Sequence, residues 1–274
     1  MIEKLIKKII KRLSMSDINS FHNYPFGKKP LADRKTYLKL WRNAKNINYP
    51  IIDQIGKDYG YSLESKWLND LALVTQVVIK NSEICYQHGP LLYSTLSDYV
   101  GRNPFSSINI LETGTARGFS SLCMARALND QNREGRIITI DQLPHNVKMY
   151  WNCIDDNESE KSRAQLLSNY SDLITRYIWF LEGKSRDVLT RLELSRIHFA
   201  FLDGSHEYKD VKSEIDYVVP RQKKGDIIFF DDYQESYFPG IVKAVKELEA
   251  NHSYRVNTIA VNEQRGYAIA ETLG

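Results

Sequence analysis

The stretch Ile108-Asn109-Ile110-Leu111-Glu112-Thr113-Gly114-Thr115-Ala116-Arg117-Gly118-Phe119-Ser120 decides the fold. An apolar, β-branched run ends at an acid, two glycines follow four residues apart, and helical spacing begins directly afterwards. This pattern predicts a strand, a tight turn and a helix. Gly114 lets the backbone turn sharply against a ligand, and Gly118 removes a side chain where helix and strand meet. Glu112 ends the strand, at the edge where open α/β sheets bind ligands.

Downstream of this turn, apolar runs alternate regularly with helical patterns. The apolar runs lie at residues 107–112, 136–141, 177–182, 197–203 and 225–231. The helical patterns lie at about 118–129, 160–173, 185–193, 207–219 and 239–250. Strands that are apolar throughout and separated by helices indicate a parallel sheet covered on both faces. Two further runs, 254–261 and 266–272, are joined by only four residues and therefore predict an antiparallel hairpin.

The residues before the first strand predict a helical extension. Helical patterns cover 34–44, 64–80 and 91–100, and segments containing Gly and Pro separate them. We therefore divide the chain into an N-terminal extension, 1–104, and an α/β domain, 105–274.

Residues 1–13 form a basic amphipathic pattern, with apolar side chains at positions 2, 5, 6, 9, 10 and 13 and basic side chains on the other face. Such a helix either lies on an anionic membrane surface or packs on protein, its own or a second subunit. The sequence leaves both interpretations open.

Composition narrows the classes of function. The formal net charge is +3, which is too balanced to indicate a nucleic-acid partner. The three cysteines are widely spaced and odd in number, so they fit neither a disulfide framework nor a zinc site. No run of about 18 apolar residues predicts a membrane span, and we expect a cytoplasmic protein.

The motif Glu112-x-Gly114-x-x-x-Gly118 resembles the first motif of class I S-adenosylmethionine-dependent methyltransferases, and not the Gly-x-Gly-x-x-Gly of dinucleotide enzymes. Five alternating strands followed by a hairpin also match the Rossmann-like seven-stranded sheet of those methyltransferases. The resemblance implies S-adenosylmethionine as cofactor, held by residues of the first motif. These are Glu112, Gly114, Thr115, Ala116, Gly118 and Ser120.

Two later strand ends complete the expected cofactor site. Asp141 ends the second strand some twenty residues past the glycine turn, where a carboxylate can accept both ribose hydroxyl protons. A capping or turn aspartate is the alternative. Gly183 and Ser185 follow the third strand, where the resemblance implies contacts on the adenine side. Ser185 is equally suited to begin the next helix as its N-cap.

A second group of acids follows the fourth and fifth strands. Asp203 begins Asp-Gly-Ser-His-Glu-Tyr, and Asp231 and Asp232 stand together before a tyrosine. These strands would be neighbours, so three carboxylates would meet at one edge of the sheet, which is costly without a cation. Oxygen ligands of this kind suit Mg²⁺, which would lower the pKa of a bound hydroxyl and hold it in line with a methyl donor.

Residues 85–250 resemble small-molecule O-methyltransferases that act on sugars of macrolide and aminocoumarin antibiotics, together with cephalosporin-tailoring relatives. In the sugar enzymes three aspartates bind Mg²⁺, and Asp203, Asp231 and Asp232 stand at the matching positions. The resemblance also places Asp203 beside the cofactor. One departure is Ser205, where the sugar enzymes carry an acid that serves as general base. His206 is the obvious substitute, with or without a metal, and a capping role is its alternative.

We therefore expect an S-adenosylmethionine-dependent O-methyltransferase acting on a small hydroxylated molecule, such as a sugar or glycosylated metabolite, with Asp203 and His206 in catalysis. The chain would also associate with itself if its extension behaves as in sugar-methylating relatives. A non-catalytic scaffold and a nicotinamide-dependent oxidoreductase are the alternatives from other classes. The long connection 143–176 either borders the cleft with His145, Tyr150 and Trp151 or is anchored by Tyr150 and Trp151.

Overall fold

The computed structural model describes residues 26–274 and contains one sheet of seven strands in the order β3-β2-β1-β4-β5-β7-β6. The strands are β1 Ile108–Thr113, β2 Gly135–Asp141, β3 Ile178–Glu182, β4 Phe199–Leu202, β5 Ile227–Phe230, β6 Tyr254–Asn262 and β7 Arg265–Thr272. The first five run parallel, and β7 runs antiparallel to both β5 and β6. The predicted Rossmann-like sheet with a C-terminal antiparallel hairpin is confirmed.

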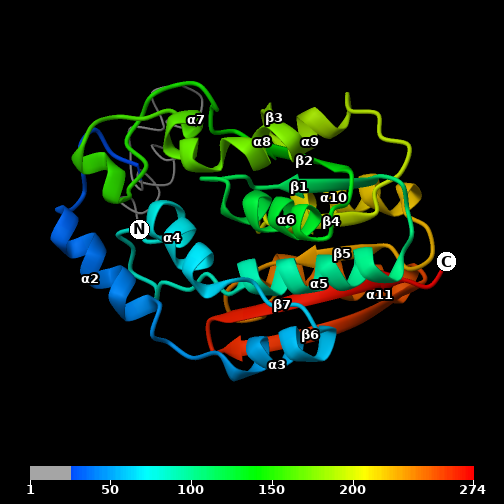
Figure 1. Ribbon diagram of the computed structural model, residues 1–274. Coiled ribbons are helices and arrows are strands. Elements are labelled where there is room, and N and C mark those ends of the chain that lie inside the picture. Colours follow the sequence, from blue (N-terminus) through cyan, green and yellow to red (C-terminus); the bar gives the residue numbers. More distant parts are fainter. Residues whose placement is uncertain (1–25) are drawn as a thin grey trace, which may run out of the picture.

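Helices cover both faces of this sheet (Figure 1). They are α2 Arg34–Ala44, α3 Pro50–Tyr59, α4 Ser65–Thr75, α5 His88–Arg102, α6 Phe119–Asp130, α7 Arg163–Leu166, α8 Ser171–Tyr177, α9 Ser185–Leu189, α10 Tyr208–Val218 and α11 Pro239–Asn251. Alternate strand residues point to opposite faces. Ile110 and Phe229 join the apolar cluster that contains α5 and α6, whereas Leu111 and Phe230 join the cluster that contains α10 and α11.

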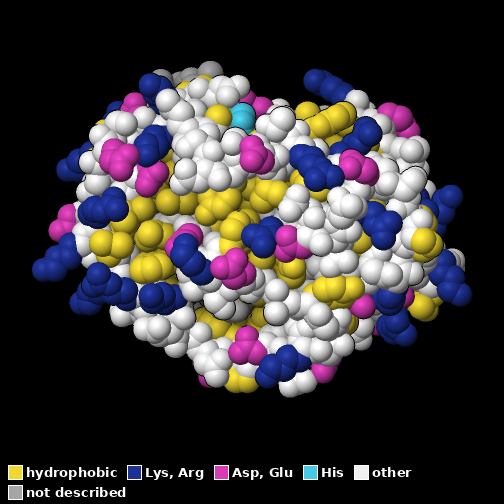
Figure 2. Space-filling view, viewed as in Figure 1, with side chains coloured by type: hydrophobic (Ala, Val, Ile, Leu, Met, Phe, Trp, Pro, Cys, Tyr) yellow, Lys and Arg dark blue, Asp and Glu magenta, His cyan; other side chains and the backbone are white. Residues whose placement is uncertain are grey.

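The helices before β1 share the first of these clusters with the sheet. α5 is buried along most of its length, and Tyr37 of α2 is also fully buried. Part of this face stays apolar at the surface. Figure 2 shows hydrophobic side chains in a band over α4 and α6, and Trp67 and Val74 of α4 are only partly buried.

Two predicted helices differ from the observed ones. The helix expected over 64–80 ends at Thr75, because the Asn152 side chain bonds both the N–H and the carbonyl of Ile79, each at 2.9 Å, and holds that residue outside the helix. The helix expected over 160–173 is interrupted between α7 and α8 by a 3₁₀ turn, Ser168–Tyr170. Helix α3 was not singled out, because prolines and glycines dominate its surroundings.

The basic amphipathic helix predicted over residues 1–13 lies outside the described residues, so its two interpretations stay predictions. Within 26–274, no helix combines the length and the apolar character needed to cross a membrane.

Candidate active site

The turn after β1 requires glycine at its first position. Gly114 has a φ of +90°, and a Cβ atom there would lie 2.1 Å from the carbonyl oxygen of Asp203. No side chain fits at that distance, so the turn packs its backbone directly against the end of β4. Gly118, with φ +89°, then begins α6. The predicted strand–turn–helix is therefore present and tightly fixed.

Asp141 joins this turn to the end of β2. Its carboxylate accepts the N–H of Ala116 at 2.6 Å and the N–H of Leu143 at 2.7 Å. The alternative role as a turn aspartate therefore holds. A carboxylate has about four lone-pair sites, so two remain for the hydroxyls of a ligand.

A cavity of about 610 Å³ opens beside these residues at the carboxyl edge of the strands. It is lined by Gly114, Ile140, Asp141, Gln142, Gly183, Lys184, Ser185, Arg186, Gly204, Ser205, His206, Glu207 and Asp210. Four of the predicted cofactor residues, Gly114, Asp141, Gly183 and Ser185, thus meet around one cavity. We call it the donor cavity.

The other predicted cofactor residues do not line the donor cavity. Glu112, Thr115, Gly118 and Ser120 are buried, Asp203 is half-buried, and Ala116 is exposed on the turn. Glu112 accepts hydrogen bonds from the hydroxyls of Ser120 and Ser121, and burial raises the pKa of its carboxyl. Their contacts with a cofactor remain predictions.

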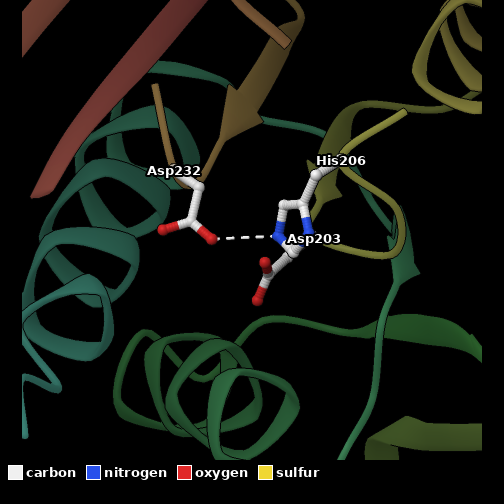
Figure 3. Close-up of side chains that lie close together, drawn as sticks. All are labelled: Asp203, His206 and Asp232. Carbon is white, nitrogen blue, oxygen red and sulfur yellow. Dashed lines mark ion pairs between the residues drawn. The ribbon is translucent and has the colours of Figure 1, made fainter. Parts of the chain in front are cut away.

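The second acidic group gathers at the ends of β4 and β5, as expected. Figure 3 shows the side chains of Asp203, His206 and Asp232 pointing toward one another, with His206 Nε2 and Asp232 Oδ2 3.0 Å apart. Arg265, the first residue of β7, lies on the other side of the acids. Its Nη1 is 2.6 Å from Asp232 Oδ1 and 3.2 Å from Asp231 Oδ1.

The surroundings shift the pKa values of the three aspartates in different directions. Burial, together with the charges of Asp231 and Asp232, raises the pKa of Asp203 well above its usual value. Burial also raises the pKa of Asp231, to about 6. Burial acts the same way on Asp232, but the hydrogen bond from His206 and the positive charge of Arg265 together hold its pKa below the usual value.

The predicted Mg²⁺ site made of Asp203, Asp231 and Asp232 remains a prediction, and the structure groups two of these aspartates with His206. Ligand atoms of Asp203, His206 and Asp232 all lie within 4.8 Å of one another, but Asp231 is outside this group. Asp231 Oδ1 instead accepts from Arg265 and from the N–H of Asp232, the latter at 2.6 Å. The positive charge that the structure places beside Asp231 and Asp232 is the guanidinium of Arg265.

A second cavity, of about 420 Å³, meets the acids from the other side. It is lined by Asn81, Ser82, Glu83, Cys85, Asp232, Tyr237, Phe238, Asn262, Gln264 and Arg265. His206 lines the donor cavity and Asp232 lines this one, so the two cavities meet at the His206–Asp232 pair. We call the second one the acceptor cavity.

Three functional residues were missed in the sequence. Arg265 was treated only as part of a hairpin link, although a lone arginine before a glycine at the start of an apolar strand was the available signal. Arg163, 2% exposed, donates to the carbonyls of Ala116 at 2.9 Å and Leu143 at 3.1 Å, and so holds the glycine turn. Its position at the start of a helical pattern gave no signal.

Glu214 is the third missed residue. It lies on α10, fully buried, where one carboxylate oxygen accepts from the Thr113 hydroxyl at 3.1 Å and the other has no hydrogen-bond partner among residues 26–274. Burial raises the pKa of Glu214 to about 7. An acid on a helix otherwise rich in charged residues looked exposed from the sequence.

The long connection after β2 is anchored by its tryptophan. Trp151 is fully buried, and its indole N–H donates to the carbonyl of Lys161 at 2.6 Å. The Arg117 guanidinium donates to the carbonyl of Trp151 itself. His145 stacks on Phe180, with ring centroids 4.0 Å apart. Of the two interpretations of this segment, anchoring describes Trp151.

Comparison with models of protein families gives a match over the part of the chain that holds the glycine turn and the acids. Residues 111–233 match a family model described as a methyltransferase domain. No curated protein matches the chain significantly.

Similar solved structures share the fold at low sequence identity. One is the O-methyltransferase TomG from Streptomyces achromogenes in complex with SAM (TM-score 0.54, 18% identity, covering 78% of this chain and 92% of TomG). Another is the O-methyltransferase NovP (TM-score 0.54, 17% identity, 88% and 100%). A third is an O-methyltransferase from Bacillus cereus in complex with SAH (TM-score 0.53, 14% identity, 87% and 99%).

The fold is that of the Rossmann-like methyltransferases, and residues 111–233 match the model of a methyltransferase domain. The predicted class of enzyme, a methyltransferase, is therefore confirmed.

Proposed function

We propose that this protein transfers a methyl group from S-adenosylmethionine to a hydroxyl of a small molecule, such as a sugar or glycosylated metabolite. The observation that carries the proposal is the meeting of the two cavities at His206 and Asp232. A methyl donor on one side and a hydroxyl on the other would face each other there.

The donor cavity suits S-adenosylmethionine, because the residues that the sequence assigned to successive parts of the cofactor lie around it. Gly114 brings backbone close to the ligand, Asp141 offers free lone pairs to ribose hydroxyls, and Gly183 and Ser185 flank the remaining side. SAM and SAH occupy the similar structures TomG and the Bacillus cereus enzyme, which supports the same cofactor here.

The acceptor cavity suits a small polyhydroxylated molecule. Asn81, Asn262 and Gln264 offer carboxamides that both donate and accept hydrogen bonds, as ring hydroxyls require. Tyr237, 54% exposed, and Phe238 add apolar ring faces. Polar groups for orientation and rings for contact area are the usual composition of small-molecule sites.

His206 is the proposed general base. If its Nε2–H donates to Asp232, its Nδ1 carries a free lone pair, and the side chain is 46% exposed and so accessible to an acceptor. As the hydroxyl oxygen attacks the methyl carbon, the sulfur–methyl bond breaks, an oxygen–methyl bond forms, and His206 Nδ1 takes the hydroxyl proton. The products are the methyl ether and S-adenosylhomocysteine, and Asp232 stabilises the imidazolium.

Calorimetric titration of S-adenosylhomocysteine tests the cofactor first. We expect binding in about the micromolar range. A panel of hydroxylated acceptors with S-adenosylmethionine then tests transfer. A thermal shift with NADH and none with S-adenosylhomocysteine would favour an oxidoreductase, whereas cofactor binding without any transfer would favour a scaffold. Repeating the titration with Mg²⁺ tests the predicted metal assistance.

Residues 1–13 give a further, separate proposal, namely peripheral contact of a cytoplasmic protein with anionic membranes. Sedimentation with anionic liposomes, with and without residues 1–15, tests it. Dependence of oligomeric state on the same residues would instead support packing on a second subunit.

A further inference from the structure

We infer that Arg265 takes the place of a divalent cation in this active site, so that the acids after β4 and β5 are organised without a metal. The inference rests on the proposed function, because it concerns how the acids serve His206 in the same reaction.

The sheet topology fixes Arg265 at the acids. β7 is paired antiparallel with β5, with Ala268 opposite Phe230, so the start of β7 lies beside the end of β5. Gly266 keeps this contact close, because its backbone packs on the backbone of Tyr233, in the segment that follows β5. A Cβ atom there would lie 2.5 Å from the carbonyl of Tyr233, whose own N–H donates to the Gly266 carbonyl at 2.9 Å. The backbone that carries Arg265 is therefore fixed beside the acids.

Most oxygens of the Asp231–Asp232 pair are already engaged. Asp232 Oδ1 accepts from Arg265, and Asp232 Oδ2 lies 3.0 Å from His206 Nε2. Asp231 Oδ1 accepts from Arg265 and from the backbone N–H of Asp232. Three of the four oxygens of this acid pair would have to exchange partners before they could bind an ion.

The charge at the site opposes a second cation. The Arg265 side chain is only 20% exposed, and Asp231 is 3% exposed, so their interaction is poorly screened by water. Half-buried Lys80 adds another positive charge that acts on both acids. An ion bound between the acids would lie close to the guanidinium and be repelled by it.

Arg265 is then a positioning residue. It fixes one oxygen of Asp232 so that the other faces His206, which holds the imidazole where the two cavities meet. A metal would have supplied this order in its place, together with the charge.

Titration of Mn²⁺, followed by its electron paramagnetic resonance signal, tests the inference on the full chain. We expect wild-type protein to bind no Mn²⁺ at about 1 mM, the weak end of protein sites for divalent ions. Arg265→Gln removes the guanidinium charge and frees the oxygens of Asp231 and Asp232 that it occupies. The variant should therefore bind Mn²⁺ roughly ten- to a hundredfold more tightly than wild type. Methyl transfer lost in this variant should return in part with Mg²⁺.

Arg255→Gln is the matched control, because Arg255 is on the same hairpin, 59% exposed, and paired with Glu271 at 2.9 Å. It should behave as wild type. Stoichiometric Mn²⁺ binding by wild type that Asp203→Asn abolishes would overturn the inference, and this comparison holds even if Arg265→Gln fails to fold. Unchanged Mn²⁺ affinity in a folded Arg265→Gln would overturn it too. Binding of S-adenosylhomocysteine is read separately, and its absence would count against the proposed function instead.

Discussion

Two groups of buried acids lie at the carboxyl edge of this sheet, and they are stabilised in different ways. Near the donor cavity, Glu112 and Glu214 accept hydrogen bonds from serine and threonine hydroxyls. Within the described part of the chain, neither forms an ion pair. At the acceptor cavity, Asp231 and Asp232 share the guanidinium of Arg265.

This difference separates acids that can hold a proton from acids that stay charged. Burial without a cation raises the pKa of Glu214 to about 7, close to neutrality. Beside Arg265 and His206, the pKa of Asp232 lies below its usual value in spite of burial. Asp231 is intermediate at about 6 and is mostly ionised at pH 7. A permanent negative charge is thus placed where the proposed base needs it.

The largest effect is expected from His206→Ala, which removes the proposed base that Asp232 orients. Methyl transfer should fall by roughly 10²–10⁴, the usual contribution of a general base, while S-adenosylhomocysteine binds as before. His252→Ala, at an exposed histidine after α11, should leave the rate unchanged. A rate close to that of wild type in His206→Ala would refute the assignment of the base.

Arg265→Ala tests the acids that are stabilised by a cation, Asp231 and Asp232. It leaves two acids without their cation, so the free energy of unfolding at pH 7 should drop by about 3–5 kcal/mol, as for other broken buried pairs. Urea unfolding measures this. Arg255→Ala, which removes an exposed pair, should cost only about 0–1 kcal/mol. Equal losses in the two variants would show that Arg265 is an ordinary surface arginine.

Glu214→Gln tests the acids that are stabilised by hydroxyl groups alone. The pKa of Glu214 is about 7 in the folded chain, against an ordinary value of 4.5, so the folded state binds the proton more tightly. The free energy of unfolding should therefore fall as pH rises from about 4.5 to 7, by up to about 3 kcal/mol from this group.

The glutamine variant should lack this fall, and above pH 7 it should be more stable than wild type. Denaturant unfolding from pH 4.5 to 8 measures the slope. Glu193→Gln, at a side chain 89% exposed, is the control. An unchanged slope in Glu214→Gln would mean that Glu214 is ionised in the folded chain throughout.

Asp141→Asn gives the smallest expected effect, at an acid held only by backbone N–H groups. Asparagine accepts through a single oxygen, so one of the bonds from Ala116 and Leu143 is lost and a ribose contact weakens. We expect affinity for S-adenosylhomocysteine to fall about tenfold, in line with one charged hydrogen bond, with little change in stability. An unaltered affinity would place the ribose elsewhere.

The sequence predicted best what is encoded locally. Gly114 and Asp141 stand at strand ends that are defined by short apolar runs, and the signal for each lies within its own stretch of sequence. The antiparallel hairpin followed from its short link, and the seven-stranded sheet followed from the resemblance to the methyltransferases. The gathering of Asp203 with Asp231 and Asp232 also follows from neighbouring strand ends.

What the sequence did not predict depends on contacts across long stretches of chain. Arg265 lies 33 residues beyond Asp232, in a link whose side chains carry no periodic pattern. The burial of Arg163 depends on carbonyls of two turns that only the folded chain brings together. The early end of α4 is set by Asn152, 73 residues away from Ile79. Local propensity contains none of this information.

The strand order also has a consequence for biosynthesis. β6 meets the sheet only through β7, so during vectorial synthesis β6 has no sheet partner until β7 leaves the ribosome. Until then the edge of β5 is open to other chains, and its two terminal aspartates lack their guanidinium. The proposed catalytic centre is therefore complete only once the hairpin has closed the sheet.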